Sequence, residues 1–546
     1  MDILNNRIRK PYFTLIFGLS ATMVMAQNDT GLSDYMWSAI ILFISMVALY
    51  GISTLLKNLM TLEAEKAGID TKNKNFGLFP EVGGFFATAG LNGKKNEKVH
   101  YLKQGFDIKL RGEAEPVIKN LPVSRFALMP TDFYGMSPIP KIDVEIGQNI
   151  KAGDVLFYDK KRPEVKYVSP VSGEFVELRR GEKRSIAELI ILADKEIQYK
   201  KFNPPNLETA DKSEIIAFLA ESGGMTLINQ RPFDIVPGID DEPDNIFIST
   251  FDTAPLAPDM NFVVSGRESD FQAGLDVLVK LTKGKVYLGI NAKEKNISKA
   301  FAEARGVEIH QFAGKHPSGN VGVQMHHISP LLLGKKAWTL GVQEVITLGA
   351  LFTKGIFDAG RLVAITGHEC KENFYAATYI GASIQELLKD NISGDNVRII
   401  SGDVLTGKTV NGDHFLNYRS DQITVITEGN KYELFGWLLP LKPRPSASRT
   451  FPNFLFPNYK FKADTNTHGE RRAFVVSGQY EDVLPMNIYP QHLMKAILAK
   501  DIEKMEGLGI YELTEEDIAI CEFVCTSKAP LQEILRDGLE YIKEQG

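Results

Sequence analysis

The N-terminal part of the chain contains two uncharged apolar runs that set it apart from the rest. The first run, residues 11–26, follows a basic stretch and ends near the small side chains Val24 and Ala26. This pattern is typical of a signal peptide, and a short uncleaved membrane helix is the alternative. The second run, residues 36–56, has 21 residues without a charge. As a helix it would span about 31 Å, which predicts a transmembrane helix.

The charges that flank these runs predict their orientation. Lysine and arginine residues precede the first run and follow the second, whereas the connector 27–35 contains none. The positive-inside rule therefore places the connector outside and everything after residue 57 in the cytoplasm. We expect residues 1–26 to be a signal peptide or a first membrane segment, and residues 27–100 to be a membrane anchor followed by a linker.

From residue 101 the apolar positions take on the short period of β-strands. Over residues 101–197, short apolar segments alternate with turns at Gly147, Gly153 and Gly173. Closely spaced strands of this kind predict a small barrel or sandwich. The Ser-Pro-Val-Ser-Gly turn at 169–173 is typical of a lipoyl-like barrel-sandwich hybrid.

The predicted barrel raises the question of a covalently carried cofactor. A carrier lysine occupies the tip of a tight hairpin just before the Ser-Pro turn, and Lys160 and Lys161 stand in that position here. With Arg162 and Pro163 also at the tip, the hairpin reads as longer than the carrier register allows. We therefore predict an unmodified barrel with a solvated basic tip, and a true lipoyl or biotinyl carrier is the alternative.

Residues 198–360 alternate between helical and strand periods. Amphipathic helical spacing covers 212–223 and 268–284. Short apolar strands cover 245–253, 285–291 and 307–314. Strands that alternate with helices predict an α/β domain with a largely parallel sheet. The sequence lacks the G-x-G-x-x-G that opens a dinucleotide-binding fold.

The remaining residues predict a small mixed domain and a helical end. Residues 361–432 read as strand, loop, helix and strand with glycine turns, which suits a β-grasp (SLBB-like) domain. Residues 433–546 begin with an aromatic and proline-rich stretch and end in amphipathic helices. Such a stretch is either buried beneath a neighbouring domain or a docking surface, and we favour docking. Its candidate contact residues are Phe435, Trp437, Pro440, Phe451 and Phe454.

Composition narrows the class of function. The 546 residues are 44% hydrophobic and 24% charged, which is typical of a globular protein with several domains. The net charge of −6 argues against nucleic acid as a partner, because phosphate binding needs a basic surface. The three cysteines are too few for a secreted disulfide framework and suit a reducing compartment.

Two clusters of potential metal ligands favour structural roles. Cys521 and Cys525 form a C-x3-C pattern without further ligands, so we expect two buried cysteines on one helix face. The stretch 316–327, HPSGNVGVQMHH, has three histidines but neither a nearby acidic residue nor a His-x3-His spacing. We expect a glycine-rich turn with structural or exposed imidazoles there. No residue of the chain is predicted to be catalytic, to bind a cofactor or to bind a metal.

Several unrelated strings occur along the chain in a distinctive order. They are KQGFDIKLRGEAEPVI (103–118), FDTAPLAPD (251–259), HPSGNVG (316–322), ELFGW (433–437), THGERRAF (467–474) and CEFVC (521–525). In this order they resemble the A subunit of the sodium-translocating NADH:quinone reductase (Nqr) family. The resemblance is specific because it depends on several independent strings rather than on one short motif.

This resemblance implies one member of a multisubunit inner-membrane complex that exports Na+. In that family, electrons pass from NADH through FAD, FMN, riboflavin and iron–sulfur centres to a quinone. The A subunit is the cytoplasmic, cofactor-free member of that complex. It would contact the B, C, D, E and F subunits, and the membrane-embedded B subunit most directly. It would also contact the quinone. The aromatic contact residues are then candidates for contact with one of these partners or the quinone.

The N-terminal extension departs from this family, whose A subunit is usually soluble. Residues 1–100 therefore imply a single-pass or two-segment anchor in a bacterial inner membrane, with the large C-terminal part in the cytoplasm. A fused anchor would raise the effective concentration of the protein at the membrane without adding contacts.

A membrane-anchored lipoyl-like adaptor of an efflux or secretion system is the alternative from another class of function. Such adaptors also join a membrane helix to barrel strands. They differ in having a long coiled-coil hairpin between the two barrel halves and in facing outward. Here the halves are separated by a short segment, no heptad run is visible, and the flanking charges favour a cytoplasmic location.

Overall fold

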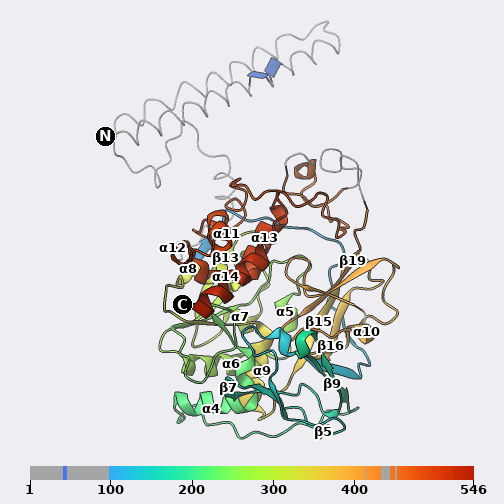
Figure 1. Ribbon diagram of the computed structural model, residues 1–546, viewed down its shortest axis with the longest axis vertical. Coiled ribbons are helices and arrows are strands. Elements are labelled where there is room, and N and C mark those ends of the chain that lie inside the picture. The colour runs from blue at the N-terminus through green and yellow to red at the C-terminus, as the bar shows by residue number, and fades with distance from the viewer. Residues whose placement is uncertain are drawn as a thin grey trace. The chain divides into compact units, whose positions relative to one another are not determined.

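The computed structural model describes residues 41–42, 44–45, 98–411, 413–431, 443–448 and 452–545 (Figure 1). The chain divides into two compact units, Met1–Asn96 and Glu97–Gly546, and each is treated by itself. In the first unit, residues 41–42 and 44–45 are helical. The predicted segment 1–26, the rest of the predicted helix 36–56 and the linker up to residue 97 lie outside the described residues. The end of the predicted linker is wrong, because Val99 and His100 belong to strand β1, Val99–Tyr101. None of the helices in the described ranges combines the length and apolarity that a membrane crossing requires.

The second unit contains a pair of small antiparallel sheets in the region predicted as a barrel. Their strand orders are β3-β9-β8-β5 and β4-β6-β7. The bounds are β3 Arg125–Leu128, β4 Lys141–Ile142, β5 Asn149–Ile150, β6 Val155–Asp159, β7 Arg162–Val168, β8 Gly173–Arg180 and β9 Ile186–Ala193. Two short 3-10 helices, η1 Pro130–Asp132 and η2 Glu182–Arg184, lie between strands. Leu156, Phe175 and Ile191 are buried in the core that these strands share.

The Ser-Pro turn before β8 depends on Gly173. The φ angle of Gly173 is 153°, and a Cβ atom there would lie 2.0 Å from the carbonyl oxygen of Leu192 on β9. Because any side chain would collide with that backbone, only glycine fits. Ser169 is buried and its hydroxyl donates to the Val171 carbonyl at 2.6 Å. The turn is therefore part of the packed scaffold.

One of the two six-stranded sheets is doubly wound and almost entirely parallel. Its strand order is β1-β13-β12-β11-β14-β10, and only β10 runs antiparallel to its neighbour. The bounds are β1 Val99–Tyr101, β10 Asn229–Arg231, β11 Asn245–Ser249, β12 Val286–Asn291, β13 Glu308–Ala313 and β14 Ala337–Leu340. Strands were predicted at 245–253, 285–291 and 307–314, so the α/β prediction is confirmed here.

Helices accompany this sheet, and two of them, α4 and α6, lie where the apolar spacing predicts helices. The bounds are α4 Lys212–Ser222, η3 Gly224–Leu227, α5 Met260–Val263, α6 Glu268–Leu281, α7 Lys299–Ala302, α8 Val321–Ile328 and α9 Val342–Thr353. Helices α6 and α9 pack unusually close together, because Gly274 and Gly349 form the contact. A Cβ atom on Gly349 would lie 1.7 Å from the Asp270 carbonyl oxygen. The two helices lie side by side next to the sheet (Figure 1).

A second mixed sheet follows in the predicted β-grasp region. Its strand order is β18-β17-β19-β15-β16-β2. The bounds are β2 Ile118–Asn120, β15 Gly360–Thr366, β16 Phe374–Tyr379, β17 Val397–Ser401, β18 Lys408–Val410 and β19 Gln422–Thr427. The predicted helix is a single turn, α10 Ile384–Leu387, whose N-terminus is capped by the Ser383 hydroxyl.

Two short strands from the beginning of this unit join sheets that are distant in sequence. Strand β1 pairs in parallel with β13 of the α/β sheet, and β2, Ile118–Asn120, pairs in parallel with β16 of the β-grasp sheet. The predicted barrel range 101–197 therefore begins with residues that pair elsewhere. A strand of three residues is too short for its apolar period to reveal its partner.

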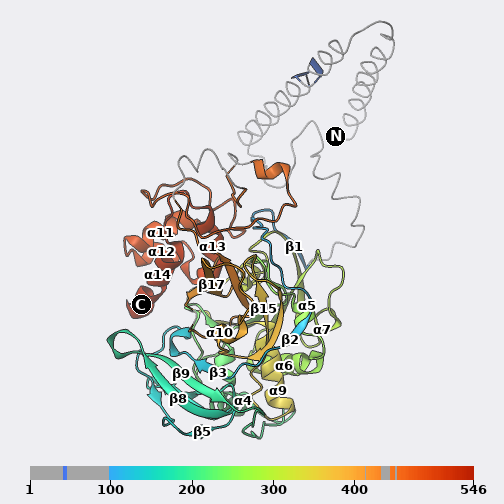
Figure 2. The same ribbon diagram turned by 90° about the vertical axis from the view of Figure 1, so that its right-hand side faces the viewer.

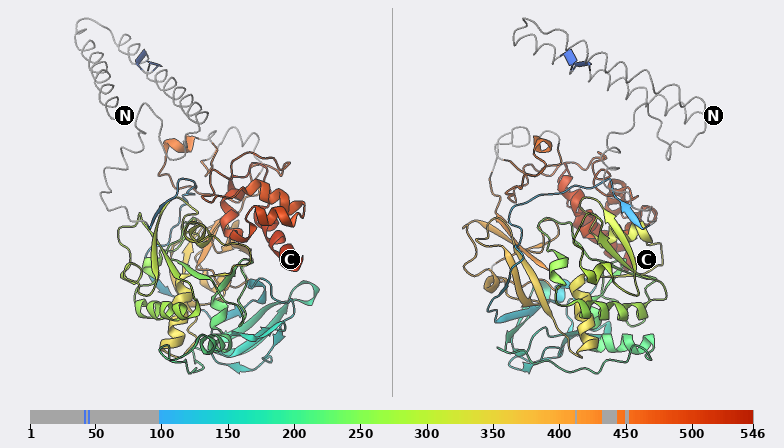
Figure 3. Two further views of the ribbon diagram at one scale, coloured as in Figure 1. Left: turned by 90° about the vertical axis from the view of Figure 1, so that its left-hand side faces the viewer. Right: turned by 180° about the vertical axis from the view of Figure 1, so that it is seen from behind.

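The chain ends in a helical group with its own core. The bounds are η4 Pro452–Leu455, α11 Pro490–Leu498, α12 Ile502–Gly507, η5 Ile510–Glu512, α13 Glu515–Val524 and α14 Leu531–Gln545. Tyr480, Leu493, Met505 and Leu535 are buried in this core. The C-terminal helices gather on one side of the unit, apart from the β8–β9 sheet (Figures 2 and 3). The predicted amphipathic C-terminal helices are confirmed.

Candidate functional site

The doubly wound sheet has a topological switch point between β11 and β14. From β11 the chain adds β12 and β13 on one side, and then returns to add β14 on the other. In sheets of this kind the crevice at the carboxyl ends of the two central strands is the usual ligand-binding position. Asp252 follows β11, and Gly341 follows β14 at the start of α9. Both residues line a cavity at this position.

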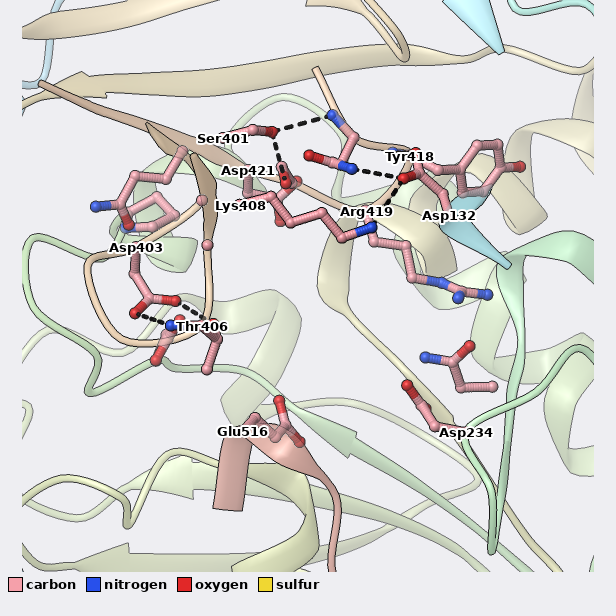
Figure 4. Close-up of a pocket in the computed structure, with 18 of the residues that line it drawn as sticks. Asp132, Asp234, Ser401, Asp403, Thr406, Lys408, Tyr418, Arg419, Asp421 and Glu516 are labelled. Atoms are coloured by element: carbon pink, nitrogen blue, oxygen red, sulfur yellow. Dashed lines mark hydrogen bonds and ion pairs between the residues drawn. The ribbon is translucent and has the colours of Figure 1, made fainter. Parts of the chain in front are cut away.

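The cavity consists of two lobes with volumes of about 360 and 380 Å³. The lobes share wall residues, among them Asp234, Asp252 and Glu516. Four parts of the chain form the wall: the barrel region, the α/β domain, the β-grasp domain and helix α13. Figure 4 shows Asp132 and Lys408 on one side of the first lobe, with Glu516 and Asp234 approaching from other elements. The cavity is therefore a junction between domains that are distant in sequence.

Acidic side chains dominate the wall of this cavity. The carboxylates that line one or both lobes are Asp132, Asp234, Asp252, Glu344, Asp403, Asp421, Glu515 and Glu516. The cations that line it are Arg231, Lys408 and Arg419. Arg419 donates to the backbone carbonyls of Thr226 and Ile228, at 2.7 and 3.3 Å. These two contacts hold its guanidinium at the wall through neutral groups.

Two buried arginines hold carboxylates at the wall. Arg361, which is 1% exposed, pairs with Glu344 and approaches Asp421 at 3.0 Å. Arg231, which is 2% exposed, donates to Glu516 at 2.8 Å and to Asp517 at 3.2 Å. Each arginine thus bridges two carboxylates. Burial of a charge is costly unless it is paired, so these contacts fix how the elements meet.

Three carboxylates on the wall, Asp252, Asp421 and Glu516, have raised pKa values. Asp252 is exposed to the cavity, where desolvation by the surrounding protein together with the nearby Asp403 charge raises its pKa to about 6. Burial also raises the pKa of Asp421, although Arg361 opposes the shift. The pKa of Glu516, which lies at the partly open wall, is raised by desolvation and by the charge of Asp517, with Arg231 acting in the opposite direction. The cavity is therefore able to hold protons near neutral pH.

Three helices begin at the second lobe, and two of them carry acidic residues in the first turn. Helix α9 has Glu344 there, and α13 has Glu515, Glu516 and Asp517. Asp517 also accepts from the Thr514 backbone N–H at 3.0 Å, which completes a capping box. The N-terminal residues of α8 line the same lobe. Helix N-termini attract anions, and here carboxylates of the chain itself are the anions at these positions.

This arrangement limits which ligands the switch-point cavity can accept. In a nucleotide-binding sheet, phosphate groups occupy the helix N-termini that Glu344 and Glu516 approach here. Carboxylates at these positions repel phosphate and favour cationic or uncharged groups. Within the described ranges, no group of three or more His, Cys, Asp or Glu side chains is arranged to hold a metal ion.

The aromatic contact residues predicted from the sequence fall largely beyond what the structure describes. Phe435, Trp437, Pro440 and Phe451 lie outside the described residues. Phe454 lies in η4, but its side chain is also outside them. The structure therefore does not test whether these residues come together, and the docking assignment stays a prediction.

The hairpin tip of the barrel is tighter than predicted. Asp159 pairs directly with Arg162, so only Lys160 and Lys161 lie between strands β6 and β7. The prediction of a lengthened tip is wrong, because Arg162 and Pro163 belong to β7. The tip is also not free-standing, since the Arg162 guanidinium donates to the Val236 carbonyl at 2.5 Å. This contact ties the hairpin to the α/β domain.

The histidines of 316–327 have structural partners. His316 is buried, its Nδ1 lies 3.2 Å from the Thr253 hydroxyl, and burial lowers its pKa to about 4. His326 Nδ1 lies 2.8 Å from Glu512, a carboxylate that is distant in sequence. His327 Nε2 lies 2.7 Å from the Pro485 carbonyl oxygen. The prediction of structural imidazoles agrees with these contacts, although an acidic partner exists. The prediction of a glycine-rich turn is wrong for residues 321–327, because they belong to helix α8, which carries His326 and His327.

The three cysteines are free and buried. Cys521 lies in α13 and Cys525 caps its C-terminus, so the predicted pair of buried cysteines on one helix is confirmed. The Tyr480 hydroxyl donates to Cys525 Sγ at 2.9 Å. Burial raises the pKa of the Cys521 thiol, which disfavours the reactive thiolate.

The sequence prediction missed the carboxylates of the cavity. Asp252 was available as the acidic residue near the carboxyl end of the predicted strand 245–253, and the carboxyl ends of parallel strands meet at one edge of a sheet. Glu516 had no comparable signal, because its approach to that edge depends on how α13 packs against the α/β domain. Asp421 and Asp132 arrive from other domains for the same reason.

Family models match three successive parts of the chain. The NqrA N-terminal barrel-sandwich hybrid domain matches residues 100–194, and the NqrA second alpha/beta domain matches residues 210–357. The NQRA C-terminal domain matches residues 362–412. The predicted barrel-sandwich hybrid, α/β and SLBB-like domains agree with these matches.

Curated relatives match most of the chain. The A subunit of the Na(+)-translocating NADH-quinone reductase of Shewanella frigidimarina (strain NCIMB 400) is 38% identical over 449 residues. The proteins of the same name from Vibrio atlanticus (strain LGP32) and Hahella chejuensis (strain KCTC 2396) are each 36% identical. Each match covers 82% of this chain and 99% of the relative.

Proposed function

The chain belongs to the family of Na(+)-translocating NADH-quinone reductase A subunits, and from this premise we propose that it serves as the A subunit of such a complex. The complex would couple electron transfer from NADH to a quinone to the transport of Na+. The observation that carries the proposal is 36–38% identity over 82% of this chain and 99% of the relatives.

Within the complex we propose a docking role without redox chemistry of its own. The switch-point cavity supports this role, because Glu344 and Glu516 approach the positions where nucleotide phosphates bind in doubly wound sheets. The burial of Cys521 and Cys525 is also consistent with a structural rather than a ligand role. NADH, the flavins, the iron–sulfur centres and the quinone would then be used by the assembly.

The proposed partners are the B, C, D, E and F subunits, with the membrane-embedded B subunit contacted most directly. Contact of the aromatic residues Phe435, Trp437, Pro440, Phe451 and Phe454 with one of these partners or the quinone remains part of this proposal. We further propose that the second unit lies in the cytoplasm at a bacterial inner membrane, and that residues 1–100 anchor it there.

Sodium uptake by inverted membrane vesicles tests the assignment to the reductase. Vesicles from cells that lack this chain should lose NADH-driven Na+ uptake and the Na+-stimulated part of quinone reduction. Expression of the full chain should restore both activities. Undiminished uptake without the chain would contradict the proposal.

Purified full-length chain tests the absence of redox chemistry. We expect it neither to oxidise NADH nor to contain bound flavin by absorbance or mass spectrometry. Detection of either would show that the docking role is incomplete, while the assignment to the reductase would stand. The efflux or secretion adaptor is not supported, because the relatives that span the chain are reductase subunits.

A further inference from the structure

A pair of extended segments presents a basic face on the second unit. Leu110 and Phe461 form a parallel bridge, in which the Arg111 N–H donates to the Phe461 carbonyl and the Phe461 N–H donates to the Lys109 carbonyl, both at 2.9 Å. Leu110 and Phe461 are buried. Because side chains alternate along an extended chain, Lys109, Arg111, Lys460 and Lys462 point outward, and all four are exposed.

Two of these four cations, Lys109 and Arg111, are held in place by neutral groups. Lys109 Nζ donates to the Pro457 carbonyl at 2.9 Å, and Arg111 Nε donates to the Lys460 carbonyl at 2.9 Å. Among the described residues, the ion pair recorded for this set joins Lys460 to Glu113 at 2.6 Å. The face therefore keeps a positive charge, although the whole chain has a net charge of −6.

Large apolar side chains adjoin the same segments. Leu455 and Phe456, at the end of η4 and just after it, are 61% and 62% exposed, and Tyr459 is 39% exposed. The Arg111 guanidinium lies 5.6 Å from the centre of the Tyr459 ring, and that ring contacts the buried Phe461 edge-on. The apolar and cationic groups thus form one continuous surface, here called the basic–apolar face. Helix η4 lies at the edge of the unit (Figure 2).

This composition matches the surface of an anionic bilayer better than that of an ordinary protein partner. Protein interfaces are depleted in lysine, whereas this face has three lysines among its four cations. Membrane-surface contacts combine lysine and arginine with Leu and Phe that enter the acyl boundary and Tyr at headgroup depth. Juxtamembrane basic clusters are attracted to anionic headgroups over about a Debye length.

The position of the face along the chain supports the same occupant. Lys109 follows β1, the first described strand of this unit, by a short connection. The N-terminal segments with two apolar runs join the unit at that strand. A chain anchored by those runs would keep residues close to β1 near the bilayer. Tethering then favours even a weak contact.

We propose that the basic–apolar face docks on the anionic headgroup layer of the membrane, with Leu455 and Phe456 entering the interface. The inference depends on the membrane association that forms part of the proposed function, and it adds which surface makes the contact and to what. Docking would fix the orientation of the second unit at the bilayer.

Site-specific fluorescence of the full chain in lipid nanodiscs tests this inference. A Leu455→Cys variant can be labelled selectively, because Cys370, Cys521 and Cys525 are buried. We expect a quencher attached to the lipids to quench the label strongly in nanodiscs rich in phosphatidylglycerol, and less in phosphatidylcholine or at high salt. An Ile146→Cys variant is the matched control, since Ile146 is 67% exposed in the barrel region. Its label should remain unquenched.

Charge variants give the second readout. A double variant that combines Lys109→Gln and Lys462→Gln should lower the ratio of docked to undocked protein by about 25-fold, roughly fivefold for each cation that is removed. Lys283→Gln with Lys504→Gln removes the same charge from side chains that are 84% and 71% exposed, and should leave quenching unchanged.

Three outcomes would overturn the inference. Equal quenching in both lipids, unaffected by the Lys109 and Lys462 changes, would show an apolar contact without headgroup recognition. Co-elution with nanodiscs without quenching at position 455 would contradict the face but leave membrane association intact. Failure of the chain to co-elute with anionic nanodiscs would contradict both the association and the inference.

Discussion

Individual arginine side chains compensate the negative charges of the acidic side chains at the cavity. Arg231 is almost completely buried and contacts Glu516 and Asp517 of α13. Arg536 of α14 forms two contacts with Glu515, at 2.5 and 2.7 Å, and stacks 3.7 Å from the Tyr134 ring centre. These contacts join the C-terminal helices to the α/β domain and the barrel region. Removal of either arginine would leave carboxylates without compensation.

The Arg231→Met variant tests this role. It leaves Asp517 buried without its cation, and breaking one partner of a buried pair costs roughly 3–5 kcal/mol. We expect the apparent free energy of unfolding in urea to fall by that amount. Lys504→Met, which breaks the exposed pair with Asp501, should change it little. Equal effects of the two variants would show that Arg231 is not a structural clamp.

Titration of Asp252 should couple stability to pH. Its folded-state pKa is raised to about 6, so the folded protein binds the proton more tightly than the unfolded chain. This contribution to stability is present below the unfolded pKa of about 4 and is lost as pH rises through about 6. Other carboxylates with lowered pKa values, such as Asp270, act in the opposite direction.

The test of Asp252 is therefore a comparison of variants. In the unmodified chain, ionisation of Asp252 contributes a loss of stability as the pH rises from 4 to 7. Asp252→Asn should remove this contribution, which thermal unfolding across that pH range measures. Asp395→Asn, at an exposed loop position, should leave the pH profile as it is. An unchanged profile for Asp252→Asn would contradict the raised pKa.

At the scale of elements, the close packing of α6 on α9 supports the cavity wall, because Gly341 and Glu344 at the start of α9 belong to that wall. Gly274 and Gly349 allow the approach, and a Cβ atom on Gly274 would lie 2.1 Å from the Val345 carbonyl oxygen. The backbones of the two helices therefore touch directly. A larger side chain at either glycine would separate them.

Gly349→Ala should destabilise the protein by overpacking. The added methyl group would meet the Asp270 carbonyl, and overpacking typically costs about 1–3 kcal/mol. Gly507→Ala, at the end of α12 where nothing lies within 4 Å of the new Cβ, should leave stability unchanged or slightly raised. Circular dichroism melting of both variants measures the difference. An unchanged melting temperature of the Gly349→Ala variant would contradict this expectation and would mean that the two helices can move apart freely.

The barrel hairpin gives a prediction about modification. Lys160 and Lys161 form a tight turn, but Arg162 binds the Val236 carbonyl and holds the hairpin against the α/β domain. Carrier lysines act from a hairpin that moves freely, so we expect both lysines to be unmodified. Mass spectrometry of the corresponding peptides from native protein should show no lipoyl or biotinyl addition. An added cofactor mass on either lysine would contradict this expectation.

The sequence predicted long, periodic elements well and contacts between distant segments poorly. Helices α4 and α6 and strand β12 follow from local apolar spacing, and their bounds agree closely with the prediction. Strand β2 and the hairpin tip at Lys160 were misjudged, because three-residue strands and tight turns carry little periodic signal. The cavity wall depends on packing between domains, which single-sequence patterns do not encode.

At the scale of the whole molecule, three domains and a helical group meet at one acidic cavity, and a basic–apolar face lies on the surface. The family relation covers 82% of the chain and implies that its partners are the other members of the reductase. The proposed docking role agrees with a fold that has the layout of a nucleotide-binding sheet but places carboxylates at its switch point.

Purification of the tagged full chain from its native membrane tests the central claim most directly. We predict that a mild detergent extract, passed over the tag, yields the other reductase subunits together with NADH:quinone reductase activity that Na+ stimulates. Recovery of the chain alone, with that activity left in the unbound fraction, would contradict its assignment as the A subunit.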